Sequence, residues 1–162
     1  MKDRYVIQTS YSRDVYAKYR GDFRCLVCHN PVSGLALVSG VLHRNHCPYC
    51  LWSRCLDLYA PGDRLSACKA PMQPVGLALK RVNKKYGAQK AGELMLVHRC
   101  CECGKLSPNR LAADDDPQAV LEVFRTSQAL DVSTRAMLEE NGIVILNKAD
   151  FHIVRVRLFG RN

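Results

Sequence analysis

The sequence predicts a small α+β protein whose fold is stabilised by bound metal. A zinc-ribbon-type β domain with two zinc sites is expected to precede two short helices and a C-terminal β-hairpin. One observation behind this fold class is a set of nine cysteines in 162 residues, all between positions 25 and 103. The other is a change of composition after residue 110, where cysteine disappears and helix-capping residues begin. Aromatic residues are only 7% of the chain, so bound metal would supply stability that a small core lacks.

The chain divides into three parts. Residues 1–22 form a basic, tyrosine-rich extension, residues 23–116 the cysteine-containing domain, and residues 117–162 the C-terminal helices and hairpin. In the extension, tyrosines alternate with lysines and arginines, which suits stacking on bases and pairing with phosphates. Packing of the extension onto the domain explains the same composition equally well.

The cysteine-containing domain is expected to be mainly β, with metal-binding knuckles at strand ends. Apolar runs at 35–42, 74–82 and 94–97 predict three short strands. Residues 80–92 are polar and strongly basic, which predicts a hairpin loop or a short helical turn between the last two strands.

The first zinc site is predicted from two CxxC pairs. Cys25 and Cys28 form one pair, Cys47 and Cys50 the other, and eighteen residues separate them, as in a zinc ribbon. A CxxC turn places two thiolates on one side of a tight backbone knuckle, and two knuckles complete a tetrahedron around Zn²⁺. Redox chemistry of the thioredoxin type is the alternative for the second pair, but it needs a βαβ context that the sequence lacks.

A second zinc site is predicted from the remaining cysteines. Its four ligands are expected to be Cys55, Cys68, Cys100 and Cys103. His46 or His98 could replace one of these thiolates, because imidazole nitrogen also binds zinc. Cys101 is then the spare cysteine, expected as a small buried side chain on the back of the knuckle.

The three residues before Cys47 are not among the predicted thiolate ligands, so zinc binding alone does not explain their presence. Arginine forks match phosphates and guanine edges, so Arg44 is a candidate contact to nucleic acid. Asn45 and His46 are expected instead to hydrogen-bond to ligand sulfurs or loop carbonyls and so to orient the metal site. Farther along, Asp63 and Arg64 could contact a partner or could form an internal ion pair that fixes the loop before Cys68.

Six motifs follow one another across this domain. They are FRCLVC, RNHCPYCLWS, PGDR, Cys68 with the following MQP, HRCCECG and NRLAADD. In this order they resemble the RNHCP domain family, a small zinc-ribbon-like family, over roughly residues 23–116. The resemblance implies the fold type and the metal sites but little biochemistry. In the family, position 55 is usually histidine, and because histidine and cysteine both bind zinc, the exchange favours Cys55 as a ligand.

The C-terminal part is expected to form two helices. Asp116 is a candidate N-cap with Pro117 at the first helical position, and three apolar side chains that follow share one face. A second short helix is expected with Asp131 or Ser133 as its cap and Gly142 at its end.

The last residues are expected to form a β-hairpin. Two β-rich runs in residues 143–159 flank a four-residue polar turn at 147–150. Arg155 and Arg157 alternate with apolar residues, so one face of the hairpin would be basic and the other apolar.

Charge and zinc together predict a function. The chain carries 24 Lys and Arg against 15 Asp and Glu, a net charge of +9, which favours a polyanionic partner. We expect a non-enzymatic zinc protein that binds nucleic acid, with structured RNA such as ribosomal RNA favoured over DNA. The predicted contacts are Arg44, Lys80, Arg81, Lys84, Lys85, Lys90, Arg155 and Arg157.

Two other functions stay open. A protein-interaction or assembly module could use an edge of the C-terminal hairpin to bind a partner or a second copy. A metal-dependent enzyme acting on nucleic acid is less favoured, because a zinc site of four thiolates has no open position and the carboxylates at 114–116 are better explained as a helix start. The sequence opens without a secretory signal and has no membrane-spanning run, so a reducing, cytoplasmic setting is expected.

Overall fold

The protein is described from a computed structural model, which places residues 21–80 and 92–160. The tyrosine-rich extension and most of the basic connection at 80–92 lie outside the described residues. Four of the predicted nucleic-acid contacts therefore lie outside them as well. They are Arg81, Lys84, Lys85 and Lys90.

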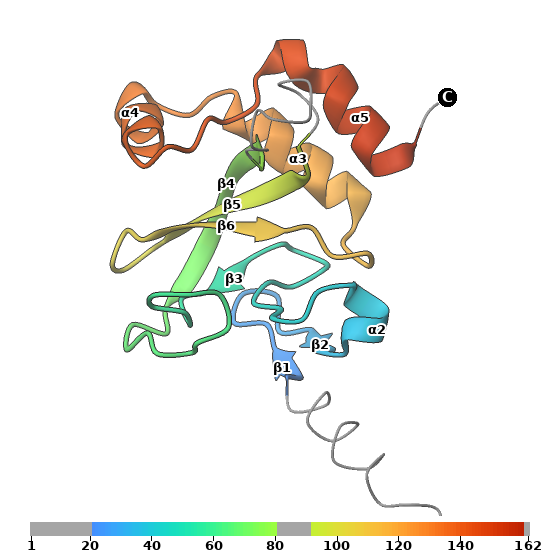
Figure 1. Cartoon of the computed structure of the whole chain (residues 1–162), viewed down its shortest axis with the longest axis vertical. Coiled ribbons are helices and arrows are strands. Elements are labelled where there is room, and N and C mark those ends of the chain that lie inside the picture. The colour runs from blue at the N-terminus through green and yellow to red at the C-terminus, as the bar shows by residue number, and fades with distance from the viewer. Residues whose placement is uncertain (1–20, 81–91, 161–162) are drawn as a thin grey trace, which may run out of the picture.

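An antiparallel sheet crosses the middle of the molecule (Figure 1). In spatial order it contains β3 (Ser53–Arg54), β4 (Pro71–Leu79), β5 (Leu94–Cys100) and β6 (Leu106–Arg110). The strands predicted at 74–82 and 94–97 are confirmed, and both are longer toward the cysteines than expected. β4 and β5 pair from Met72 opposite Cys100 to Leu79 opposite Leu94, so one end of this ladder carries a metal ligand.

A two-stranded ribbon lies apart from that sheet and holds the first cysteine pair. It consists of β1 (Phe23–Arg24) and β2 (Pro31–Val32). The strand predicted at 35–42 is wrong, because this segment forms the one-turn helix α2 (Ala36–Ser39). Gly40 ends the turn in a left-handed conformation at φ 70°, with its N–H bonded to the carbonyl of Ala36. Local hydrogen bonds here outweigh the β preference of the apolar run.

The two predicted helices are confirmed. α3 (Pro117–Ser127) begins after Asp116, whose side chain accepts a hydrogen bond from the N–H of Gln118. α4 (Val132–Glu140) is capped by Asp131, which accepts from the N–H of Thr134. Both caps satisfy backbone donors that a helix start leaves without intrahelical partners.

The predicted C-terminal hairpin is wrong. Its second strand is instead the helix α5 (Phe151–Phe159), preceded by the 3₁₀ turn η1 (Lys148–Asp150). The polar residues 147–150 form a reciprocal capping box, which starts a helix rather than closing a hairpin. Of the first run, Ile145 makes only an isolated bridge to Ala78. Burial of Val154 in the core overrides the β preference of this valine-rich segment.

The helices and the metal-binding loops occupy opposite ends of the molecule. In Figure 1, α3, α4 and α5 lie above the sheet, whereas β1, β2 and α2 lie below it. One apolar cluster joins Leu77 and Leu96 of the sheet to Val120 and Phe124 of α3, and another joins Val97 to Leu138 of α4. None of the described helices combines the length and apolar character that crossing a membrane requires.

Candidate metal centres

The first cluster of thiols lies where the β1–β2 ribbon meets the loop before β3. Its four sulfurs lie within 4.8 Å of one another and belong to Cys25, Cys28, Cys47 and Cys50. The sulfurs of Cys25 and Cys50 are 3.5 Å apart, as are those of Cys28 and Cys47. Four sulfurs about 2.3 Å from one Zn²⁺ in a tetrahedron would be about 3.8 Å apart, so the spacing fits the ion.

Backbone geometry builds each knuckle of this first centre. The N–H of Val27 points at the Cys25 sulfur, and the N–H of His29 closes a turn on the Cys25 carbonyl. His29 and Leu51, each one residue beyond the second cysteine of its pair, have positive φ values of 60° and 62°. The chain thus turns sharply after each pair, which keeps both thiols of a pair on one side.

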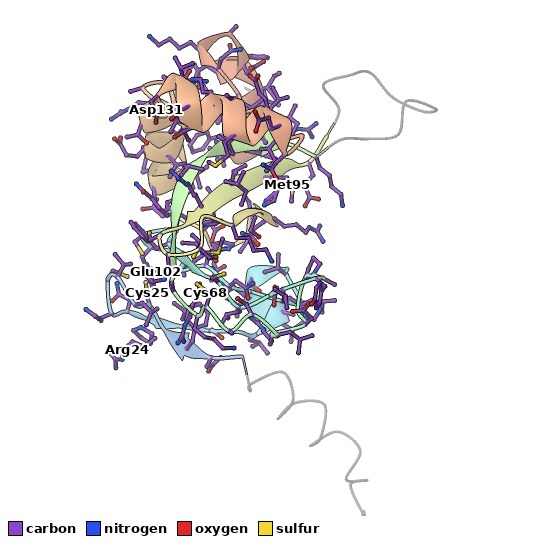
Figure 2. All side chains as sticks on the ribbon, turned by 90° about the vertical axis from the view of Figure 1, so that its left-hand side faces the viewer. Arg24, Cys25, Cys68, Met95, Glu102 and Asp131 are labelled. Carbon is purple, nitrogen blue, oxygen red and sulfur yellow. The ribbon has the colours of Figure 1, made fainter. Side chains whose placement is uncertain are left out.

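The second cluster lies at the lower end of the main sheet. It consists of Cys55, Cys68, Cys100 and Cys103, whose sulfurs also lie within 4.8 Å of one another. The sulfur of Cys55 is 3.8 Å from that of Cys103, and the sulfur of Cys68 is 3.6 Å from that of Cys100. The two clusters are positioned to bind two metal ions, in agreement with the two Zn²⁺ ions expected. Figure 2 labels one cysteine of each cluster, Cys25 and Cys68.

The thiols of each cluster differ in acidity. Burial opposes ionisation of Cys28, but the N–H of Asn30 and the neighbouring thiols outweigh it and lower the pKa of Cys28 to about 7. In the second cluster, backbone N–H groups likewise overcome burial and lower the pKa of Cys100 to about 7. Burial raises the pKa of Cys50, and it raises that of Cys55 to about 12. Four thiolates this close repel one another, so a divalent cation is what would hold all four ionised.

Neither histidine proposed as an alternative ligand belongs to a thiol cluster. His98 is fully buried, its Nε2 donates to the carbonyl of Leu51 at 2.7 Å, and its Nδ1 accepts from Asn109 at 2.8 Å. Burial, together with the nearby His46, lowers the pKa of His98 to about 3, so this ring is neutral. His46 bonds through Nε2 to Asp115. The expectation for Cys101 is wrong, since this cysteine is exposed.

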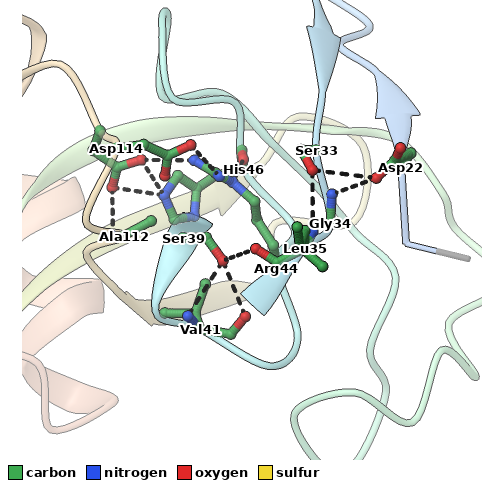
Figure 3. A network of polar contacts seen from close by, with 11 residues as sticks. Asp22, Ser33, Gly34, Leu35, Ser39, Val41, Arg44, His46, Ala112 and Asp114 are labelled. Carbon is green, nitrogen blue, oxygen red and sulfur yellow. Dashed lines mark hydrogen bonds and ion pairs between the residues drawn. The ribbon is translucent and has the colours of Figure 1, made fainter. Parts of the chain in front are cut away.

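Arg44 is not the free contact residue that the sequence suggested. Its side chain has no exposed surface, and its guanidinium donates to Asp114 at 2.8 Å, to Asp115 at 3.1 Å and to the carbonyl of His46 at 3.0 Å (Figure 3). Asp115 also accepts from His46 at 2.8 Å and from the N–H of Ala112 at 2.7 Å. No phosphate or base can reach Arg44 in this arrangement. Its role is to tie the segment before Cys47 to the start of α3.

Asn45 and its neighbours complete the support beneath the first centre. The amide of Asn45 donates to Asp57 at 2.8 Å, and its oxygen accepts from Arg64. The expected pair of Asp63 with Arg64 is wrong, because Asp63 accepts backbone N–H groups of its own turn. These donors, led by the N–H of Leu65, hold the pKa of Asp63 below its usual range. None of the contacts found for Asn45 or for the His46 ring is to a cysteine sulfur, contrary to expectation.

A comparison with protein families matches residues 20–121 to the RNHCP domain. The chain belongs to the RNHCP domain family. Neither the curated proteins nor the solved structures compared with the chain gave a match. The five residues that spell the family name are positions 44–48. Residues 44–46 form side-chain hydrogen bonds inside the protein, and Cys47 belongs to the first metal centre. Asp114 and Asp115, which hold Arg44, lie inside the matched region as well.

The remaining predicted contact residues lie on different parts of the surface. Lys80 is exposed at the end of β4. Arg155 and Arg157 are exposed on α5, but residues two apart on a helix point to different sides. The basic hairpin face that they were expected to form is therefore wrong, and they do not form one contact surface.

Proposed function

We propose that this RNHCP-domain protein is a non-enzymatic nucleic-acid-binding protein, with structured RNA as the favoured partner, in which two Zn²⁺ ions fix the binding surface. The observation that carries the proposal is a group of exposed or half-buried cations beside the metal centres. This basic face consists of Arg24, Arg54, Lys69 and Arg99. None of the four forms an ion pair with a carboxylate within residues 21–80 and 92–160.

The register of the sheet places two of these arginines together. Arg54 pairs with Pro71, and Arg99 pairs with Gln73, two residues farther along β4. Because alternate residues of a strand share a face, Arg54 and Arg99 emerge on the same side of the sheet. Sequence reasoning missed this pair, because 45 positions separate its members and only the strand pairing brings them close.

Apolar side chains lie among these cations near the first metal centre. Arg24 and Arg54 border one hollow together with Leu26, Val27 and Trp52. Leu26 and Val27 belong to the first knuckle and are 44% and 41% exposed. Cations interleaved with aromatic and apolar groups suit binding to phosphates and to base faces.

Several acidic side chains are engaged by other groups of the protein. Asp114 and Asp115 bind Arg44, Asp57 binds Asn45, Asp63 closes its turn and Asp116 caps α3. Carboxylates engaged in this way contribute less repulsion toward a polyanion than carboxylates without such partners would. The chain carries a net charge of +9, which supports a polyanionic partner.

The test is binding to a structured RNA measured by fluorescence anisotropy across a salt series. Each phosphate contact that is lost should reduce the slope of log K against log salt by about 1. Arg54→Ala combined with Arg99→Ala should reduce it by about 2. The matched control, Arg125→Ala with Lys148→Ala, removes the same charge at the helical end. The proposal would be wrong if the two double variants had equal slopes of log K against log salt. It would also be wrong if the wild-type protein bound the RNA no more tightly than an unrelated protein of the same charge.

A further inference from the structure

The second metal centre is more accessible to solvent than the first. Cys103 is exposed, whereas every ligand of the first centre is buried or half-buried. The knuckle that carries Cys103 borders open space, since a Cβ built at Gly104 would meet no heavy atom of the described chain within 4 Å. A solute that reacts with sulfur would therefore reach Cys103 before any other ligand of either centre.

A second sulfur lies close to that of Cys103. The sulfur of Cys55 is 3.8 Å away and belongs to a distant part of the chain. Cys55 is only 2% exposed, so a solute reaches it through a change at Cys103 rather than directly. Cys101 is the other exposed thiol, and it belongs to neither cluster. A disulfide between Cys55 and Cys103 would remove two ligands from the second centre at once.

The same centre positions most of the basic face. Three of its four cations are sequence neighbours of ligands, and the neighbouring pairs are Arg54 with Cys55, Lys69 with Cys68, and Arg99 with Cys100. Arg54 and Lys69 are also linked directly, because Nε of Arg54 donates to the carbonyl of Lys69 at 3.1 Å. This bond to a carbonyl leaves the charge of the arginine in place. The arrangement of these cations therefore depends on the second centre.

The turn at Lys69 is held by the segments that carry two of the ligands. Its φ is 57°, a left-handed conformation that residues other than glycine rarely adopt. The N–H of Lys69 donates to the carbonyl of Cys55 at 3.1 Å, and the N–H of Cys55 donates to the carbonyl of Ala70 at 2.9 Å. Both bonds join the segments of Cys55 and Cys68, which a shared metal ion would keep together. Loss of that ion would allow the turn to relax and Lys69 to move away from Arg54.

We propose that Cys103 is a site of oxidation by hydrogen peroxide, and that its oxidation releases the second zinc ion and disperses the basic face. The Cys103 thiolate attacks one peroxide oxygen, so that a sulfur–oxygen bond forms, the oxygen–oxygen bond breaks and the other oxygen takes up protons and leaves as water. The Cys55 thiolate then attacks the Cys103 sulfur, a disulfide forms, and the remaining oxygen also leaves as water. The two sulfurs lose a pair of electrons, which the peroxide gains. Cys68 and Cys100 take up protons as Zn²⁺ leaves.

The consequence for nucleic-acid binding rests on the proposed function. Four thiolates around one Zn²⁺ carry net negative charge, whereas a disulfide with two protonated thiols carries none. Oxidation therefore removes negative charge beside the basic face, and charge alone would strengthen binding to a polyanion. We expect binding to weaken instead, because Arg54, Lys69 and Arg99 no longer form one surface.

The experiment adds hydrogen peroxide in small steps to the zinc-loaded full chain. Released zinc is measured with a chromogenic chelator, and alkylation with mass spectrometry identifies each cysteine as reduced or disulfide-bonded. We expect one of the two zinc ions to leave at least about tenfold faster than the other, together with formation of the disulfide between Cys55 and Cys103. A thiol reductant with added zinc should restore the second ion.

Three variants identify the sulfur that reacts. Cys103→His keeps a zinc ligand that cannot form a disulfide, so it should retain both ions and lose the fast release. Cys50→His is the matched control in the first centre and should keep the fast release. Cys101→Ser removes the exposed thiol outside both clusters and should keep it as well. If Cys103→His binds only one ion, the disulfide found in the wild-type chain decides the question.

The outcomes separate this proposal from the proposed function. Equal release rates for the two ions, a first disulfide without Cys103, or fast release that Cys101→Ser abolishes would each overturn the oxidation site. After oxidation, the slope of log K against log salt for RNA should be smaller by about 2, as in Arg54→Ala with Arg99→Ala. An unchanged slope would overturn the effect on the basic face and leave the proposed function standing. Absence of RNA binding before oxidation would contradict the proposed function and leave the oxidation site intact.

Discussion

Replacing Arg44 by methionine should destabilise the protein severely. Methionine has a similar length but cannot donate to Asp114, to Asp115 or to the carbonyl of His46. Asp115 is 3% exposed and would remain as a buried carboxylate without its main counter-charge. Breaking a buried ion pair from one side costs about 3–5 kcal/mol, a large part of the roughly 5–15 kcal/mol of a whole domain. Arg44→Lys should recover only part of this loss, because one ammonium group cannot reproduce the three hydrogen bonds that the planar guanidinium makes.

The assay is unfolding by urea, followed by tryptophan fluorescence and circular dichroism at constant excess zinc, with zinc content measured for each variant. Arg125→Met is the control, because its ion pair with Glu122 is exposed and should contribute less than about 1 kcal/mol. A double-mutant cycle with Asp114→Asn should give a coupling energy of about 0.5–3 kcal/mol. A loss below 1 kcal/mol in Arg44→Met, matching the control, would refute the view that Arg44 is a structural tie.

Three further predictions concern the metal, a helix cap and pH. Zinc content should fall from two ions per chain to one in Cys55→Ser and in Cys68→Ser, measured by elemental analysis; two ions retained in both variants would contradict the second centre. Asp116→Ala should cost about 1 kcal/mol in urea unfolding through loss of the α3 cap, whereas Asp116→Asn, which keeps an acceptor, should cost less. The folded pKa of His98 is about 3 against about 6.5 unfolded, so the unfolded chain binds more protons between these values and stability falls as pH drops below 6.5. Between pH 7.5 and pH 5.5 the free energy of unfolding of the wild-type protein should fall by about 1.4 kcal/mol more than that of His98→Gln. Parallel pH profiles of the two proteins would contradict a low pKa of His98 in the folded state.

The metal centres were predictable because coordination chemistry is local and periodic. CxxC spacing specifies a knuckle whatever the surrounding fold, and the family resemblance explained the cysteine at position 55. The helix starts at Asp116 and Asp131 were equally predictable, since a cap is a short-range hydrogen bond. Each CxxC knuckle and each helix cap depends on residues within about one turn of each other.

The C-terminal segment was not predictable by the same reasoning. Its valines and isoleucines favour a strand when taken alone, and the turn at 147–150 has the composition of a hairpin loop. The structure forms α5 because a capping box starts the 3₁₀ turn η1 that leads into it and because Val154 is buried completely. Which surface a segment packs against is decided by residues far away in the chain, and composition does not reveal it.

Arg44 shows why a conspicuous basic residue need not be a contact residue. Its natural partners, Asp114 and Asp115, lie some 70 positions away and looked like a helix start, which is also true of Asp116 beside them. The carboxylate of Asp115 that binds the Arg44 guanidinium also hydrogen-bonds to Nε2 of His46. The Arg-Asn-His segment before Cys47 is therefore fixed to the residues before α3 through Asp115. Arg44 supplies the charge that allows Asp115 to stay buried and hold that histidine in place.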